Sequence, residues 1–228
     1  MDYKFSPQLD ILPHGQLFLW DELIDIPEQF TLYGGTAVAL HLGHRESIDF
    51  DFFSNEGLNI DRLLTDIPFM SDARVIQREP EALSVIVDRG NRVKVSFFGH
   101  LNLKQIEEPL ISEDNDLKIA SLRDLAATKV KVIQDRGEAK DYIDIYHLSK
   151  NGLALEEALA GARHVYGRQF NALSSLKALA YFGDGDLKTL SPEIKQHLSK
   201  ISSEIDLQKL SALEKEVTQT RRPTQDRS

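Results

Sequence analysis

The chain of 228 residues contains no cysteine, which excludes disulfide bonds, thiolate metal sites and a cysteine nucleophile. It also lacks an apolar run long enough to span a bilayer, and its N-terminus lacks the basic-then-apolar pattern of a signal peptide. Internal repeats and low-complexity tracts are missing as well. We therefore expect a cytoplasmic globular protein that has no membrane partner.

Positive charge is scarce, because 27 Lys and Arg residues face 36 Asp and Glu residues and the formal net charge is −9. Proteins that coat nucleic acids without sequence preference are usually basic. Any contact with a nucleic acid must therefore be local, or be made to a terminus. The hydrophobic content of 41% is ordinary for a globular protein, and the length suits one large domain or two small ones.

The stretch from residue 30 to residue 53 carries the first chemical signal. It predicts a strand over 30–33, a turn at Gly34 and Gly35, a short helix over 37–42 ended by Gly43, and a strand over 47–53. In the second strand, alternation predicts one apolar face and one face that carries two carboxylates. The apolar face has Ile48, Phe50 and Phe52, and the other has Ser47, Asp49, Asp51 and Phe53.

Asp49 and Asp51 lie side by side on one strand face, where two like charges repel each other unless a cation joins them. A glycine turn at a helix N-terminus is a ready phosphate site. The pair therefore indicates a divalent cation held beside a phosphate group. The alternative is a tight turn beside a solvated strand face.

A second signal lies on a predicted helix that begins with a capping box, Ser121 to Asp124, and runs to about residue 136. Lys129 lies on the apolar stripe of this helix, whereas Lys131 lies on a mixed outward face. A lysine on such a stripe must snorkel, pair with an acid or meet an anionic ligand. A methionine of similar volume at position 129 is expected to keep the fold.

The next helix carries Asp141 and Asp144 one turn apart, so the two carboxylates share a face. The simplest interpretation is surface charge, with Asp141 favoured by the positive end of the helix dipole.

Taken in order, these motifs resemble a known family. Gly-Gly-Thr-Ala and Arg-x-Ser-x-Asp-x-Asp, followed by Asp-Leu-Ala-Ala-Thr-Lys, an arginine and Lys-Asp-x-x-Asp, resemble the nucleotidyltransferase core of the AbiEii/AbiGii toxins, which include the MenT-type toxins. The resemblance runs from about Phe30 to Leu148. It implies transfer of a nucleotide monophosphate from an NTP to an acceptor such as a tRNA 3′ end, with Mg²⁺ or Mn²⁺ as cofactor and a cognate antitoxin as partner.

The resemblance also implies roles for single residues. Asp49 and Asp51 would hold the metal ion, and Asp141 would orient or deprotonate the acceptor hydroxyl. In the family the helical lysine and the first aspartate of the later motif line the active site, so Asp49, Asp51, Lys129 and Asp141 form the expected catalytic set. Asp144 also matches, with a role that is catalytic or structural. The expected nucleotide-binding residues are Gly34, Gly35, Thr36, Arg45, Ser47 and Lys129.

One position departs from the general nucleotidyltransferase pattern, in which a third carboxylate often stands on a neighbouring strand. Strands are predicted over 73–78, 82–88 and 92–98, the last two joined by a turn at 89–91. If the strand over 92–98 lies beside Asp49 and Asp51, Lys94 or Ser96 takes that place. The alternative function is therefore a catalytically inactive nucleotide-binding or antitoxin-interacting protein.

The expected fold is α+β. A nucleotidyltransferase-like core with a small mixed sheet and flanking helices covers residues 1–115, and a helical region over 116–218 completes the active cleft. We expect a loose arm over 1–13, an acidic and polar connection over 101–115 and a disordered tail over 219–228.

Overall fold

The computed structural model describes the backbone of residues 4–219 and the side chains of residues 4–214, so most of the predicted tail lies outside the described residues. The chain divides into two units. Unit 1 comprises residues up to 103 together with 107–125, and unit 2 comprises residues 104–106 and those from 126 onward. The division falls within helix α4 (Leu122–Val132), whereas the predicted boundary at residue 115 lies earlier, between two short strands.

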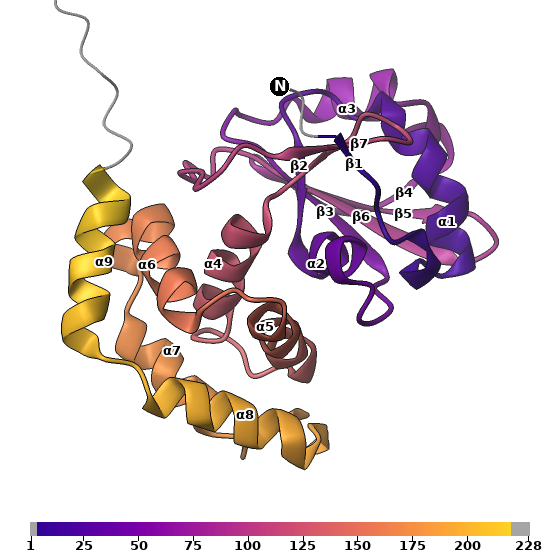
Figure 1. The fold of residues 1–228 in the computed structure, drawn as a ribbon. Helices are drawn as coiled ribbons and strands as arrows, with labels where there is room; N and C mark the ends of the chain where they lie inside the picture. The colour runs from indigo at the N-terminus through magenta and orange to yellow at the C-terminus, as the bar shows by residue number, and fades with distance from the viewer. Residues whose placement is uncertain (1–3, 220–228) are drawn as a thin grey trace, which may run out of the picture. The chain divides into compact units, whose positions relative to one another are not determined.

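Unit 1 is built on a sheet of eight described strands in the order β1-β7-β8-β2-β3-β6-β5-β4. Figure 1 shows the ribbon of this sheet. Parallel pairs (β1 with β7, β8 with β2, β3 with β6) and antiparallel pairs occur together, so the predicted mixed sheet is confirmed. The strands are β1 (Lys4–Phe5), β2 (Thr31–Tyr33), β3 (Asp49–Phe53), β4 (Arg74–Glu79), β5 (Ala82–Asp88), β6 (Arg92–Phe98), β7 (Leu110–Ser112) and β8 (Lys118–Ile119).

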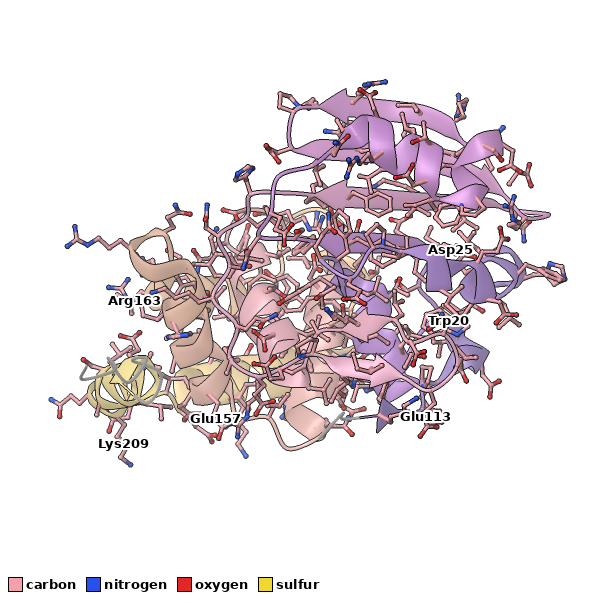
Figure 2. The ribbon with its side chains drawn as sticks, turned by 90° about the horizontal axis from the view of Figure 1, so that it is seen from above. Trp20, Asp25, Glu113, Glu157, Arg163 and Lys209 are labelled. Atoms are coloured by element: carbon pink, nitrogen blue, oxygen red, sulfur yellow. The ribbon has the colours of Figure 1, made fainter. Side chains whose placement is uncertain are left out.

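The apolar face of the central strands forms the core of unit 1. Phe50 and Phe52 of β3 and Phe97 of β6 are fully buried. Helix α1 (His14–Trp20) brings Trp20, labelled in Figure 2, to a ring distance of 6.3 Å from Phe50. Burial of large aromatic side chains dominates the stability of such cores. Ile48, predicted on this face, precedes β3 and is 61% exposed, so that part of the prediction is wrong.

Two predictions about irregular segments are also wrong. Of the predicted loose arm over 1–13, residues 4–13 are ordered by contacts, because β1 pairs with β7 and the Gln8 amide donates to the Leu40 carbonyl at 2.8 Å. The segment 101–115 contains β7, which pairs with β1 and β8. Strands of two and three residues are too short to show an alternating pattern.

Short sequence signals determine where helices α2 and α3 of unit 1 end or begin. Helix α2 (Gly34–Leu42) ends at Gly43, whose φ of +62° is the left-handed conformation that glycine tolerates. Helix α3 (Ile60–Asp66) is capped by Asn59, which accepts a bond from the Arg62 amide. A 3-10 helix, Asp21–Asp25, follows α1 directly.

Unit 2 is helical. Ser121 caps α4 by accepting a bond from the Asp124 amide at 3.1 Å, which confirms the capping box. The other helices are α5 (Ala139–Lys150), α6 (Leu155–Tyr166), α7 (Ala172–Leu179), α8 (Pro192–Ser203) and α9 (Leu207–Gln219). No helix within the described residues is long and apolar enough to cross a membrane.

Candidate functional site

Strand β3 presents the two carboxylates as predicted. Asp49, Asp51 and Phe53 are partly exposed, and they alternate with the buried Phe50 and Phe52. A residue on one face of a strand has its next same-face neighbour two positions away. The two aspartate side chains therefore stand next to each other on the polar face of the sheet.

The glycine turn at the start of α2 is in direct contact with these groups. Gly34 has a φ of +77°, and a β-carbon on it would lie 2.9 Å from the Asp51 Oδ2 atom. A β-carbon on Gly35 would overlap Nη2 of Arg45 and would lie 3.4 Å from Oγ of Ser47. Only glycine lets the carboxylate and the guanidinium approach the turn this closely.

Thr36 connects the glycine turn to Ser47, which precedes β3, and to the first residue of β3. Its hydroxyl bonds to Oγ of Ser47 at 2.8 Å and donates to the Asp49 carbonyl, and its side chain is buried. The structure thus brings together six of the residues singled out in the first motif: Gly34, Gly35, Thr36, Arg45, Ser47 and Asp51. Thr36 and Ser47 hold the turn together through their side chains, a task that the sequence alone did not reveal.

The residues of the second motif form a buried ion cluster in unit 2. The Lys129 Nζ atom lies 2.8 Å from Oδ1 of Asp141 and 2.6 Å from Oδ2 of Asp144. The Lys129 side chain is 5% exposed, and both aspartate side chains are fully buried. Of the three possibilities for Lys129, the structure selects pairing. The interpretation of Asp141 and Asp144 as surface charge is wrong.

Arg136 completes this cluster from the segment that joins α4 to α5. Its Nε atom donates to Oδ2 of Asp141 at 3.0 Å, and its side chain is 46% exposed. Asp141 therefore receives charged donors at both carboxylate oxygens. Sequence reasoning quoted this arginine as part of the motif but did not name it as a site residue. The signal was its position five residues before an aspartate on the buried face of α5.

Burial also acts on the phenol next to this cluster. Burial, with the charges of Asp141 and Asp184, raises the pKa of Tyr142 to about 12. The Tyr142 hydroxyl therefore stays protonated at neutral pH and donates to the Ala178 carbonyl at 3.3 Å. These properties exclude Tyr142 as a general base.

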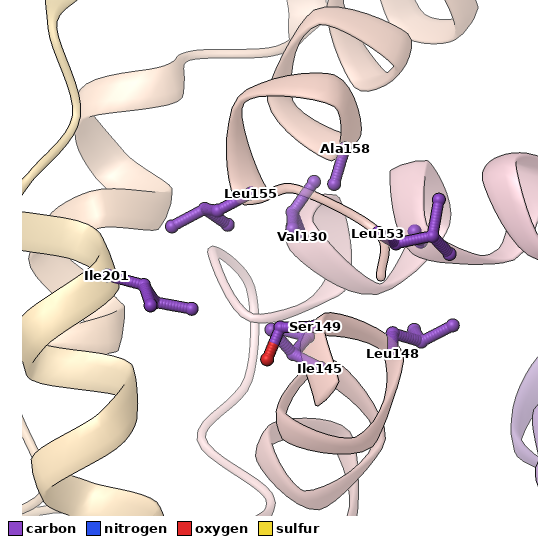
Figure 3. A pocket seen from close by; sticks show the side chains of 9 residues that line it. Val130, Ile145, Leu148, Ser149, Leu153, Leu155, Ala158 and Ile201 are labelled. Carbon is purple, nitrogen blue, oxygen red and sulfur yellow. The ribbon is translucent and has the colours of Figure 1, made fainter. Parts of the chain in front are cut away.

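Unit 2 also contains a small pocket whose lining is apolar, unlike the charged groups of the two motifs (Figure 3). Its lining has one polar side chain, Ser149, whose hydroxyl bonds to the Tyr146 carbonyl at 2.7 Å and to the His197 ring at 2.8 Å. The hydroxyl proton goes to the carbonyl, so the imidazole is the donor toward Ser149 and cannot activate it as a nucleophile. The other lining residues are Ala126, Val130, Ile145, Leu148, Leu153, Leu155, Ala158 and Ile201.

Strand β6 lies beside the carboxylate strand. The parallel register places Lys94 opposite Asp49 and Ser96 opposite Asp51. The third carboxylate is therefore missing from this strand, as the sequence predicted. Within residues 4–214, no group of three or more His, Cys, Asp or Glu side chains is arranged to hold a metal ion. A metal ion at Asp49 and Asp51 would need ligands from the substrate or from water.

Comparisons with known proteins agree with this geometry. The profile of the family described as nucleotidyl transferase AbiEii toxin, type IV toxin–antitoxin system, matches residues 18–225. An uncharacterised protein of Aquifex aeolicus (strain VF5) is 32% identical over 164 residues, which cover 71% of this chain and 77% of that protein.

Two solved structures share the fold. MenT4, a nucleotidyltransferase toxin of Mycobacterium tuberculosis H37Rv, matches with a TM-score of 0.55 and 14% identity, covering 88% of this chain and 89% of its own. A proposed nucleotidyltransferase of H. pylori matches with a TM-score of 0.52 and 19% identity, covering 89% and 92%. At these identities the likeness establishes the fold and nothing finer.

Proposed function

Because the chain belongs to the family of AbiEii nucleotidyltransferase toxins of type IV toxin–antitoxin systems, we propose that it transfers a nucleotide monophosphate from an NTP to an RNA 3′-hydroxyl, that of tRNA above all. The acceptor oxygen forms a bond to the α-phosphorus while the bond from that phosphorus to the α,β-bridging oxygen breaks. Pyrophosphate leaves, and the hydroxyl proton passes to a base or to water. A cognate antitoxin is the expected protein partner.

The observation that carries this proposal is the contact of Asp51 and Arg45 with the Gly34-Gly35 turn. The turn is the N-terminus of a nine-residue helix, where backbone N–H groups attract anions. Arg45 adds a permanent positive charge beside Gly35. These groups suit the triphosphate of a nucleotide.

The donor set at β3 fits Mg²⁺ or Mn²⁺. Magnesium prefers one or two carboxylates plus phosphate oxygens over an all-protein cage, and Asp49 and Asp51 are two neighbouring carboxylates. When bound, such an ion offsets negative charge that develops on the phosphate oxygens. The chain's own part is to orient the triphosphate through the turn amides and Arg45, so that the α-phosphorus faces the acceptor.

We assign Lys129, Asp141 and Asp144 a positioning role in this reaction: their ion pairs hold one another and Arg136 in place. Asp141 is fully buried and holds Lys129 and Arg136 at once, so its contacts favour support of the two cations over removal of a proton. The role of Asp141 as a base stays a prediction from family resemblance. Arg136 is the most exposed of the four charged side chains in this group.

The net charge and the position of the cations favour a short RNA end as the acceptor. A net charge of −9 disfavours a protein that grips long duplexes, whose affinity depends on many phosphate contacts. Two cations beside the second motif nonetheless keep much of their side chains exposed: Arg136, which is 46% exposed, and Lys140, which is 50% exposed. Such a local group suits a short single-stranded end.

The test is incubation with each α-labelled NTP, Mg²⁺ and total RNA, followed by separation of RNA from protein. We expect label on tRNA, loss of labelling in Asp51→Asn, and weaker labelling as salt rises. Label on protein side chains would show that the acceptor is wrong. If no label appears with any of the four nucleotides and folded protein, the inactive binding protein becomes the better description.

A further inference from the structure

The polar sheet face next to Asp49 and Asp51 carries a lysine, Lys94, and β6 carries no third acid. Residues paired across β3 and β6 share a face and lie about 4.8 Å apart in the direction of the strand pairing. Lys94 is the partner of Asp49, and Ser96 is the partner of Asp51. Both positions therefore face the same side as the two carboxylates.

Ser96 cannot replace an acid. Its side chain is fully buried, and its hydroxyl is hydrogen-bonded to that of Ser84 on β5 at 3.2 Å. Ser84 in turn bonds to Oε1 of Gln77 on β4 at 3.3 Å. The hydroxyl of Ser96 is neutral and belongs to a row of polar contacts across the sheet.

Lys94 is different, because it is partly exposed and its ammonium group forms no ion pair with any acidic residue that the structure describes. The register places Lys94 opposite Asp49, yet Lys94 forms no salt bridge with Asp49 or Asp51 in the part of the chain that the structure describes. Lys94 thus neutralises neither of these carboxylates, and its ammonium has donors for an anion.

A sum of formal charges explains why a lysine, in place of an acid, is suited to the position beside Asp49 and Asp51. In a two-metal site, two divalent ions and three carboxylates sum to a charge of plus one. Counted in the same way, without the arginine of the turn, one divalent ion, the two carboxylates Asp49 and Asp51, and the Lys94 ammonium also sum to plus one. Lys94 in place of a third carboxylate therefore offsets the triphosphate to the same extent with one metal ion fewer.

We propose that Lys94 binds a nucleotide phosphate directly and takes the place of the second metal ion, so that the protein works with a single divalent cation. This inference rests on the proposed function, because it needs a nucleotide at β3. It makes Lys94 a substrate-binding residue and leaves the metal ion to Asp49 and Asp51.

The test uses the full-length protein with non-hydrolysable α,β-methylene NTP analogues and isothermal titration calorimetry. We expect wild-type protein to bind one analogue measurably in EDTA, and Lys94→Met to weaken this binding about tenfold, the size of one charged hydrogen bond. Lys94→Arg should retain most of the affinity. Lys177→Met, on an exposed lysine of α7, is the matched control and should bind like wild type.

Counting Mn²⁺ by electron paramagnetic resonance gives a second readout. We expect one Mn²⁺ per chain in the presence of the analogue, lost in Asp51→Asn. Two Mn²⁺ per chain, or equal affinity of Lys94→Met and wild type, would overturn the role of Lys94 while the proposed function stands. If wild-type protein binds none of the four analogues, with or without Mn²⁺, the proposed function itself fails.

Discussion

Replacement of Lys129 by methionine is the sharpest test of the buried ion cluster. If only α4 is considered, a methionine at position 129 matches the apolar residues around it. In the structure it removes the ammonium that lies 2.8 Å and 2.6 Å from the two fully buried carboxylates of Asp141 and Asp144. Loss of one partner from a buried ion pair costs about 3–5 kcal/mol of unfolding free energy. We therefore expect Lys129→Met to destabilise the protein, which corrects the expectation from sequence.

The measurement is urea unfolding followed by far-UV circular dichroism, which reports on the helices of unit 2. With an m-value of about 2 kcal/mol/M, a loss of about 4 kcal/mol lowers the urea midpoint by about 2 M. Trp20 is the single tryptophan and lies in unit 1, so its fluorescence follows the other unit in the same samples. The circular dichroism midpoint should shift more than the fluorescence midpoint.

Two variants make this prediction specific. Lys131→Met removes an ion pair to the exposed Asp135, which lies in the turn after α4, and should change stability by no more than about 0.5 kcal/mol. The double variant Lys129→Met/Asp144→Asn should be more stable than Lys129→Met, because it removes a buried charge that has lost its lysine. If Lys129→Met and Lys131→Met unfold at the same urea concentration, the cluster does not stabilise unit 2.

Three further predictions concern unit 1. Gly34→Ala should abolish RNA labelling and lower stability by about 1–2 kcal/mol, because alanine disfavours the φ of +77° and would press on Asp51; labelling and thermal unfolding at wild-type values would refute this. Asp49→Ala should remove metal-dependent nucleotide binding in calorimetry, and unchanged binding would exclude Asp49 as a ligand. Burial lowers the pKa of His41, whose ring bonds to the Ala120 carbonyl, so the unfolded state binds the proton more readily and stability should fall as pH drops through about 6.5. His41→Gln should unfold with a weaker dependence on pH between 7.5 and 5.5, and an equal dependence would show that another group causes it.

Local features of unit 1 were predictable because short-range rules determine them. Strands β5 and β6 have the predicted bounds, since each alternates over seven residues and a turn at Gly90, with φ of +81°, joins them. The ends of α2 and α3 follow from Gly43 and Asn59. The two carboxylates on one face of β3 need only the strand period. These predictions depend on residues a few positions apart.

Pairing across long stretches of chain was not predictable. Strands β1 and β7 contain two and three residues, and they meet although more than 100 residues separate them. The register of β3 against β6, which decides whether Lys94 or Ser96 stands beside each aspartate, depends on how the whole sheet assembles. The sequence offered both residues as candidates, and the sheet placed one opposite each carboxylate.

The sequence by itself determined which side chains carry the chemistry: two carboxylates beside a glycine turn, a lysine on an apolar stripe and two aspartates one turn apart. Only the tertiary structure decided how those charges are used. Periodicity showed that Lys129 is buried but not what neutralises it, because its partners lie on the next helix, twelve and fifteen residues along the chain. The packing of α5 against α4 brings the charges together, and a buried charge is tolerated only where packing supplies its counter-charge.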